Sequence, residues 1–248
     1  MEYTIQVLLT GIAIAAFCAT LAGGLFALRL KDNLHLVLGF SAGAVVAVAL
    51  FGLLPEALDR GLKFYTASSL LSFTALGFLA YLVLDRIQVL HGGHDHAAHE
   101  PRAVRRGTLS AGSLSAHSLL DGISIGVAFQ ASAAVGAIVA VAVLTHDFSD
   151  GINTMSVVLK NGGDRRQGLL WLLVDALAPA AGIALTFFFV LPEEAFGAVL
   201  ALFAGLFLYI GASDLIPESH HAHPKLLTTL MTLLGAAVLY VTIAFIGR

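Results

Sequence analysis

The stretch AAVGAIVAVAVLTHDFSDGINTMSVVL, residues 133–159, decides the fold because it is apolar, long enough to cross a bilayer, and interrupted by one polar hexad. A membrane-spanning helix needs about 20 mostly apolar residues. The interruption is His146-Asp147-Phe148-Ser149-Asp150-Gly151, and a matching hexad, His117-Ser118-Leu119-Leu120-Asp121-Gly122, lies in the preceding apolar stretch. The sequence therefore predicts two consecutive membrane helices that both carry ionisable side chains.

Each hexad places a histidine and an aspartate four residues apart, so on a helix the two side chains point the same way. An ionisable group at mid-bilayer costs at least about 2.5–3.5 kcal/mol, and such groups usually face a partner, a cavity or an ion. Two matching pairs favour an ion. The glycine that ends each hexad would let a neighbouring helix approach closely.

The overall composition is that of a membrane protein. The chain has 248 residues, of which 58% are hydrophobic and 12% charged, and its mean hydropathy is +0.90. Soluble domains usually carry about twice that charged fraction. The net charge of -3 and the absence of a long basic tract give no reason to expect nucleic acid as a partner. A single cysteine, Cys18, excludes an intrachain disulfide.

Apolar stretches of spanning length predict an all-α membrane protein with eight transmembrane helices. They are residues 4–28, 34–55, 66–90, 109–129, 133–159, 167–191, 195–216 and 226–246. The connections between them are short, apart from a histidine-rich one at 91–108. We therefore expect a single transmembrane domain over 1–248, with 91–108 as a histidine-rich loop within it.

The distribution of lysine and arginine predicts the orientation, since cytoplasmic loops are enriched in these residues. One set of alternate loops holds ten of them: Arg29, Lys31, Arg86, Arg102, Arg105, Arg106, Lys160, Arg165, Arg166 and Lys225. The other side holds Arg60, Lys63 and Arg248. We expect the first side to be cytoplasmic and both termini to lie outside, in a protein of the plasma (inner) membrane.

Histidines and carboxylates follow the same asymmetry. With this orientation the cytoplasmic histidines are His91, His94, His96 and His99 in the 91–108 loop, and His220, His221 and His223 after the seventh stretch. The loop histidines could buffer or sense metal, or the loop could be only a flexible tether. The outer carboxylates are Glu56, Asp59, Glu193 and Glu194, which raise the local concentration of cations.

A short internal repeat suggests inverted halves. Leu53-Leu54-Pro55-Glu56 ends the second stretch and Leu215-Ile216-Pro217-Glu218 ends the seventh. The second helix would run outward and the seventh inward, so the two copies would lie on opposite faces, as in many secondary transporters. We expect helices 1–3 and 6–8 to form the two halves around helices 4 and 5.

The short turn between helices 4 and 5 makes them antiparallel neighbours. His117 is then expected near the level of Asp150, and Asp121 near the level of His146. Two imidazoles and two carboxylates suit a borderline divalent ion. The alternative is that these side chains are only interhelical hydrogen-bonding groups, worth about 0.6 kcal/mol each. That alternative does not explain why both helices carry the same pair followed by glycine.

The two hexads resemble the paired His-Asn-x-Pro-Glu-Gly motifs of the ZIP family of divalent-metal transporters. Eight helices, a histidine-bearing loop between helices 3 and 4, and the Pro-Glu ends of helices 2 and 7 also match that family. The resemblance implies a metal site, often binuclear, on helices 4 and 5, and a homodimer. It implies His117, Asp121, His146 and Asp150 as main ligands. Ser118 takes the usual Asn position, and Asp147 matches a position that can contact a second metal.

The sequence departs from that motif at several positions. Both glutamates are replaced by the shorter Asp121 and Asp150, and both prolines by Leu120 and Ser149. Many relatives have Glu before Pro in helix 6, whereas here Ala178 precedes Pro179. Asp175, one turn earlier, could replace that glutamate as a ligand or serve as a partner for backbone groups.

These features predict a transporter that carries a divalent transition metal into the cytoplasm, with Zn²⁺ as the first expectation. Fe²⁺, Mn²⁺, Co²⁺ and Cd²⁺ suit the same ligands, and the metal would be a substrate and not a cofactor. The alternative is an intramembrane zinc-dependent hydrolase, although the chain lacks His-Glu-x-x-His. A proton or monovalent-ion pathway would use the carboxylates but not the histidines. Apart from the metal, the expected partner is membrane lipid.

Overall fold

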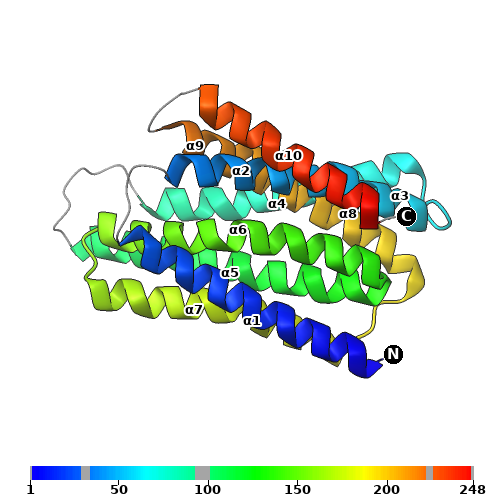
Figure 1. Cartoon of the computed structure of the whole chain (residues 1–248), viewed down its shortest axis with the longest axis horizontal. Coiled ribbons are helices and arrows are strands. Elements are labelled where there is room, and N and C mark those ends of the chain that lie inside the picture. The colour runs from blue at the N-terminus through cyan, green and yellow to red at the C-terminus, as the bar shows by residue number, and fades with distance from the viewer. Residues whose placement is uncertain (1, 29–33, 93–100, 222–225, 247–248) are drawn as a thin grey trace. The chain divides into compact units, whose positions relative to one another are not determined.

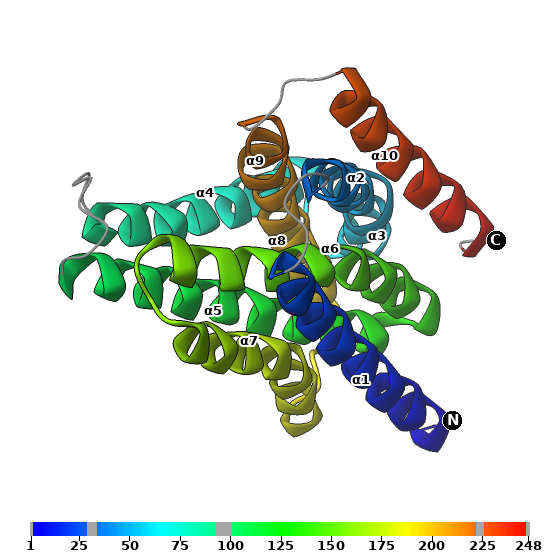
Figure 2. The ribbon, with the colours of Figure 1, turned by 60° about the vertical axis from the view of Figure 1, so that its left-hand side comes forward.

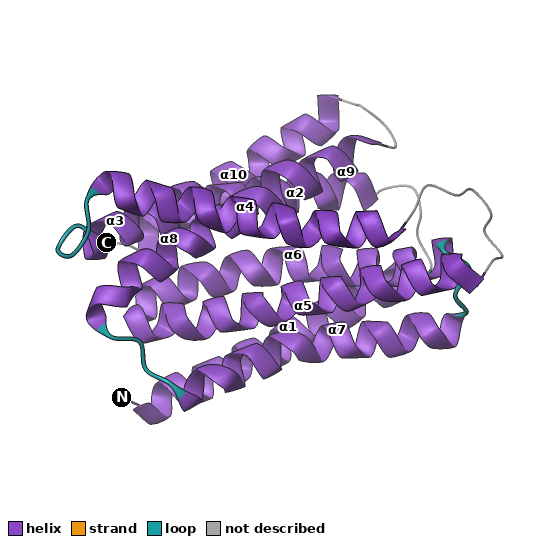
Figure 3. Ribbon diagram, turned by 180° about the vertical axis from the view of Figure 1, so that it is seen from behind, coloured by secondary structure: helices purple, strands orange, loops and turns teal. Residues whose placement is uncertain are grey.

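Every regular element of the protein is a helix within the part of the chain that the computed structural model describes, residues 2–28, 34–92, 101–221 and 226–246 (Figures 1 and 3). The elements in chain order are α1 (Glu2–Ala27), α2 (Leu34–Ala47), η1 (Val48–Leu53), α3 (Leu54–Gly61), α4 (Ala67–Gly92), α5 (Pro101–Ala131), α6 (Ala133–Lys160), α7 (Arg165–Leu185), η2 (Thr186–Phe188), α8 (Glu193–Tyr209), η3 (Ile210–Leu215), α9 (Ile216–His221) and α10 (Leu226–Ile246). Each of the eight predicted stretches is helical over most of its length, although the helical part of the stretch 167–191 ends at Phe188.

Seven of the described helices are long and apolar enough to cross a membrane. They are Thr4–Ala27, His35–Gly61, Ala67–Leu84, Ala133–Lys160, Arg165–Phe188, Glu193–Ser219 and Leu226–Phe245. The eighth predicted span belongs to α5, which is helical but more polar, because its middle carries His117, Asp121 and several serines.

The predicted loop over 91–108 is too long. Helix α4 continues to Gly92, and α5 begins at Pro101 instead of near residue 109. Proline is favoured in the first turn of a helix, and the arginines that follow are good helix formers. His91 is thus at the end of a helix, and His94, His96 and His99 lie outside the described residues. The second predicted group of cytoplasmic histidines is His220, His221 and His223. Helix α9 extends to His221, and His223 lies outside the described residues.

Two six-residue π-helices, which the sequence does not predict, interrupt the second and seventh spans. In η1 the Leu54 N–H donates to the Ala49 carbonyl, and in η3 the Ile216 N–H donates to the Gly211 carbonyl. Each segment lies just before a proline, Pro55 or Pro217. Proline removes one N–H from the helical ladder and clashes with the carbonyl four residues earlier, so the wider turn relieves the crowding.

The chain divides into two compact units, which share helices α4, α5 and α6. The first unit comprises Met1–Lys31, Val83–Ile123 and Asp147–Thr186. In it α1 packs along α7 (Figure 2). Glycines allow this unit to pack closely: a Cβ on Gly24 would lie 2.3 Å from a methyl carbon of Leu172 on α7.

The second unit comprises Asp32–Leu82, Ser124–His146 and Phe187–Arg248. Its main packing is α2 against α10, where a Cβ on Gly43 would lie 1.8 Å from the Thr232 carbonyl oxygen. Helix α2 also packs on η3, and α8 packs on η1, so the two interrupted spans contact one another reciprocally. Fully buried Leu53, Leu200 and Phe207 belong to its core.

Candidate metal site

Three of the four predicted ligands lie together in the first unit. The His117 Nε2 atom is 3.1 Å from an Asp121 carboxylate oxygen one turn along α5. The same nitrogen is 3.7 Å from a carboxylate oxygen of Asp150 on α6. All three side chains are buried. The antiparallel register predicted from the short α5–α6 turn is therefore confirmed for His117 and Asp150.

His146 lies one turn before Asp150 on the uninterrupted helix α6 and is fully buried. Its Nδ1 atom is 2.9 Å from the Ala142 carbonyl oxygen. A carbonyl only accepts, so Nδ1 must donate, and in the neutral imidazole Nε2 is then the nitrogen that carries the lone pair. The ring also packs edge-on against Phe207, with centroids 6.0 Å apart. These contacts fix both the tautomer and the orientation of the imidazole.

The four side chains form one group with the composition of a metal site. One ligand atom from each of His117, Asp121, His146 and Asp150 lies within 4.8 Å of all the others. Zinc–ligand bonds are about 2.0–2.2 Å, so the ligand atoms of a tetrahedral site are roughly 3.3 Å apart. The distances of 3.1 and 3.7 Å from His117 Nε2 to the Asp121 and Asp150 carboxylate oxygens are close to that spacing.

Helices α5 and α6 pass through the site without a break. This follows from Leu120 and Ser149, which stand where the resembling family has prolines, because neither removes a backbone N–H from the helix. The carbonyls of these turns stay within the helical ladder, and the side chains of the four-residue group supply the polar atoms.

A second buried polar cluster lies beside the first and joins α5, α6 and α7. The Ser118 hydroxyl donates to Asp175 Oδ1 and the Thr154 hydroxyl to Asp175 Oδ2, both at 2.8 Å. All three side chains are buried. Ser118 follows His117, and Thr154 is one turn beyond Asp150. Asp175 therefore holds both ligand-bearing helices through residues next to their ligands.

Glycines bring neighbouring helices against the site. A Cβ on Gly122 would lie 2.1 Å from the Pro179 carbonyl oxygen of α7, and one on Gly182 would lie 2.2 Å from the Leu119 carbonyl oxygen of α5. On α6, a Cβ on Gly151 would lie 1.9 Å from the Thr20 carbonyl oxygen of α1. The predicted role of the two hexad glycines in close helix packing is confirmed.

The structure separates the predicted site residues into the four-residue group, a hydroxyl–carboxylate cluster, and Asp147, which belongs to neither. Asp147 is fully buried but is not part of the four-residue group, in keeping with its position about 100° around α6 from His146. Ser118 and Asp175 belong to the hydroxyl–carboxylate cluster. The sequence reading missed Thr154, although its spacing of four residues from Asp150 places it on the same face of α6.

The chain is similar in sequence to known metal transporters. The family model of the ZIP zinc transporters matches residues 91–243, more than half of the chain. Among curated relatives, zinc transporter ZIP4 of Homo sapiens is 33% identical over 101 residues, 41% of this chain and 16% of that protein. Zinc transporter ZIP10 of Danio rerio is 32% identical over 106 residues, 42% of this chain and 12% of that protein.

A third relative, metal cation symporter ZIP8 of Rattus norvegicus, is 31% identical over 104 residues, 41% of this chain and 22% of that protein. The matched segments are thus a small part of these longer relatives. The match of the family model covers helices α5 and α6 with both hexads, and the buried histidine–aspartate group lies within it. The chain belongs to the ZIP zinc transporter family.

Proposed function

We propose that this protein transports a divalent transition metal, with Zn²⁺ as the first substrate, through a site formed by His117, Asp121, His146 and Asp150. The observation that carries the proposal is the convergence of two imidazoles and two carboxylates in a buried position on apolar helices. Nitrogen and carboxylate ligands suit Zn²⁺, and also Fe²⁺, Mn²⁺, Co²⁺ and Cd²⁺.

The charge of the group supports a divalent cargo. Moving an ion from water to a buried site is costly unless opposite charges and polar ligands replace its hydration. Asp121 and Asp150 together provide two negative charges, which balance a divalent cation and would overcompensate a monovalent one. The two histidines complete the coordination without adding charge.

The remaining predicted residues are assigned supporting roles. Asp175 and Ser118 are proposed to fix the distance between α5 and α6, since each oxygen of the Asp175 carboxylate already accepts a hydroxyl hydrogen bond. Asp147, buried next to His146 in sequence but outside the four-residue group, is proposed as a ligand for a second cation or as a partner of the first ligands.

Uptake into the cytoplasm is the proposed direction. The ten-to-three distribution of lysine and arginine supports it, as does the placement of histidines on the basic side. On the other side, Glu56 and Asp59 line a cavity of about 230 Å³ in the second unit. Glu56 pairs with Arg60 at 2.6 Å and Glu193 with Lys63 at 3.6 Å, so the attraction for cations rests chiefly on Asp59 and Glu194.

Three further proposals follow from the resemblance and the sequence. The protein is proposed to work as a homodimer in the plasma (inner) membrane with both termini outside. The inverted repeat is proposed to relate the second and seventh spans. In support of this repeat, each of these spans carries a six-residue π-helix directly before Leu54-Pro55-Glu56 or Ile216-Pro217-Glu218.

Purified protein in liposomes that enclose a zinc-sensitive dye tests the function. We expect saturable Zn²⁺ entry that chelation of external metal stops, with competition by Cd²⁺, Fe²⁺, Mn²⁺ or Co²⁺ ranking the substrates. The intramembrane hydrolase, the alternative reading of the same residues, would bind Zn²⁺ without moving it into the liposome. Binding at high affinity with no flux above that of empty liposomes would overturn the proposal.

A further inference from the structure

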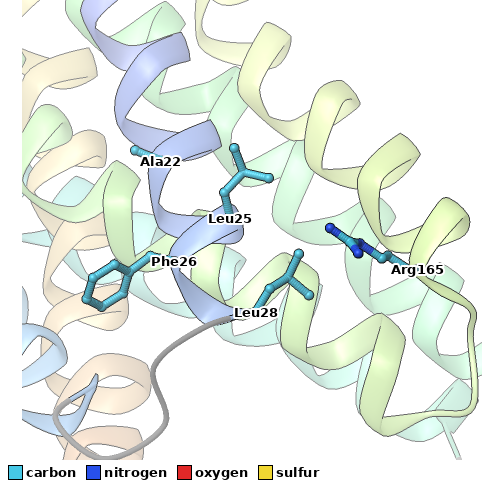
Figure 4. A pocket seen from close by; sticks show the side chains of 5 residues that line it. All are labelled: Ala22, Leu25, Phe26, Leu28 and Arg165. Atoms are coloured by element: carbon cyan, nitrogen blue, oxygen red, sulfur yellow. The ribbon is translucent and has the colours of Figure 1, made fainter.

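A groove in the first unit has a composition unlike that of the metal site. It has a volume of about 570 Å³ and lies where α1 ends and α7 begins (Figure 4). Its lining consists of Ala22, Leu25, Phe26 and Leu28 from α1 and Arg165 from α7. Four apolar side chains and one guanidinium group are complementary to an amphiphile that has an apolar chain and a negative charge.

Close packing of α1 just before the groove sets its shape. A Cβ on Gly23 would lie 1.8 Å from the Phe148 carbonyl oxygen of α6, so the backbones nearly touch there. The Phe26 ring packs against Phe148, with centroids 5.5 Å apart. Leu25 and Leu28 instead project between α1 and α7, and the Arg165 side chain extends from α7 toward them (Figure 4).

Arg165 has a charge that the described residues do not neutralise. The adjacent Asp164 is the N-cap of α7, and its carboxylate accepts the Gln167 N–H at 2.7 Å. In the described part of the chain no carboxylate oxygen lies within 4.0 Å of the Arg165 guanidinium. Arginine stays charged at any physiological pH and binds phosphate with two parallel hydrogen bonds.

The groove lies at the ends of two candidate membrane spans. The candidate span of α1 ends at Ala27 and that of α7 begins at Arg165, so the guanidinium is at the end of an apolar stretch of spanning length. Ala22 lies five residues inside the end of its span, or about 8 Å along a helix. The groove thus changes from charged to apolar in the direction in which a phospholipid does.

We propose that this groove is a binding site for an anionic phospholipid, with its phosphate at Arg165 and an acyl chain along Leu25, Phe26 and Leu28. The inference concerns a surface separate from the metal ligands and does not depend on the metal that is carried. Anionic lipids are concentrated in the cytoplasmic leaflet, and Arg165 is on the basic side of the chain.

Native mass spectrometry of the full chain in detergent tests the site, with phosphatidylglycerol and phosphatidylcholine of the same acyl chains as probes. We expect phosphatidylglycerol to bind more tightly, and Arg165→Gln to lower its affinity about tenfold, as for loss of one charge-assisted contact. Arg166→Gln is the matched control, because Arg166 is the next residue, equally charged and outside the groove. It should leave the affinity unchanged.

A second variant fills the groove without touching its charge. Leu25→Trp should weaken phosphatidylglycerol binding while the protein still elutes as a single species and takes up Zn²⁺. Equal loss in Arg165→Gln and Arg166→Gln would show a diffuse basic surface and overturn the proposal. Equal affinity for the two lipids would also overturn it, as would competition by glycerol phosphate, which would indicate an anion site that needs no acyl chain.

Discussion

Asp175 shows how one buried residue can support a site without belonging to it. Its two oxygens accept from Ser118 and Thr154, residues that sit on α5 and α6 beside the ligands. Without the Asp175 carboxylate, the buried Thr154 hydroxyl would lose this acceptor, which is costly. The Ser118 hydroxyl could still donate to the Leu114 carbonyl, 3.1 Å away. The residue therefore offers a test that separates positioning from metal ligation.

Asp175→Ala should lower Zn²⁺ affinity and uptake strongly, whereas Asp175→Asn should keep uptake within about fivefold of the parent, the equivalent of one neutral hydrogen bond of about 1 kcal/mol. The amide can still accept one hydroxyl and donate to the other, which can reorient. Isothermal titration and liposome flux measure both quantities. If Asp175→Asn loses as much affinity as Asp175→Ala, the carboxylate charge is required and Asp175 is a ligand.

The sequence predicts which residues group together in the site only where their spacing repeats. The paired His-x-x-x-Asp pattern predicts the grouping of His117 with Asp121 and of His146 with Asp150, because helical periodicity alone places each pair on one face. The contact of Thr154 with Asp175 could not be predicted, since it depends on how α7 is rotated against α6. That rotation is set by packing and not by local sequence.

At the scale of elements, the site depends on glycines that let helices touch. Gly122→Ala should lower both thermal stability and uptake, because its Cβ would lie 2.1 Å from the Pro179 carbonyl oxygen and force α5 away from α7. Overpacking of this kind costs about 1–3 kcal/mol. Gly11→Ala is the control, since nothing lies within 4 Å of its added Cβ.

The melting temperature in detergent and the rate of Zn²⁺ entry measure this effect. We expect a fall of several degrees for Gly122→Ala and none for Gly11→Ala. Equal melting temperatures and rates for both variants and the parent would mean that the α5–α7 contact is looser than described.

Element types were predictable from the length of each apolar run, but two details were not. The π-helices η1 and η3 involve one extra residue per turn, which leaves the apolar composition of the span unchanged. The start of α5 at Pro101 could not be predicted from hydropathy. Arg102, Arg105 and Arg106 make this segment polar, and a polar segment between two apolar stretches predicts a loop. Polar residues form helices well, so hydropathy marks the membrane boundary and not the end of the helix.

At the scale of the whole molecule, the orientation in the membrane is a prediction of charge counting. In a Cys18→Ser background, cysteines placed at Asp95 and Ala222 should resist an impermeant reagent added outside intact cells. Leu62→Cys should react, because Leu62 is exposed and lies on the side with fewer basic residues. Efficient labelling at 95 and 222 with protection at 62 would reverse the proposed topology.

The histidines of the loop are expected to tune transport and not to carry it. They lie outside the predicted hydrocarbon region, where they cannot compensate the dehydration of an ion within it. Replacing His91, His94, His96 and His99 together by alanine should leave saturable Zn²⁺ entry in place. Loss of all flux in a variant that is folded and inserted would place the loop in the pathway.

The central claim is that the metal passes through the buried histidine–aspartate group. The most direct measurement is the initial rate of Zn²⁺ entry into liposomes for Asp121→Asn and Asp150→Asn. The control for loss of one carboxylate is Glu193→Gln, since Glu193 is exposed and already paired with Lys63. Both asparagine variants keep the shape and remove one of two charges that offset dehydration. We expect their flux to fall at least about tenfold, while Glu193→Gln stays near the parent rate. Parental rates for both asparagine variants would contradict the account, because the metal would then cross the membrane elsewhere.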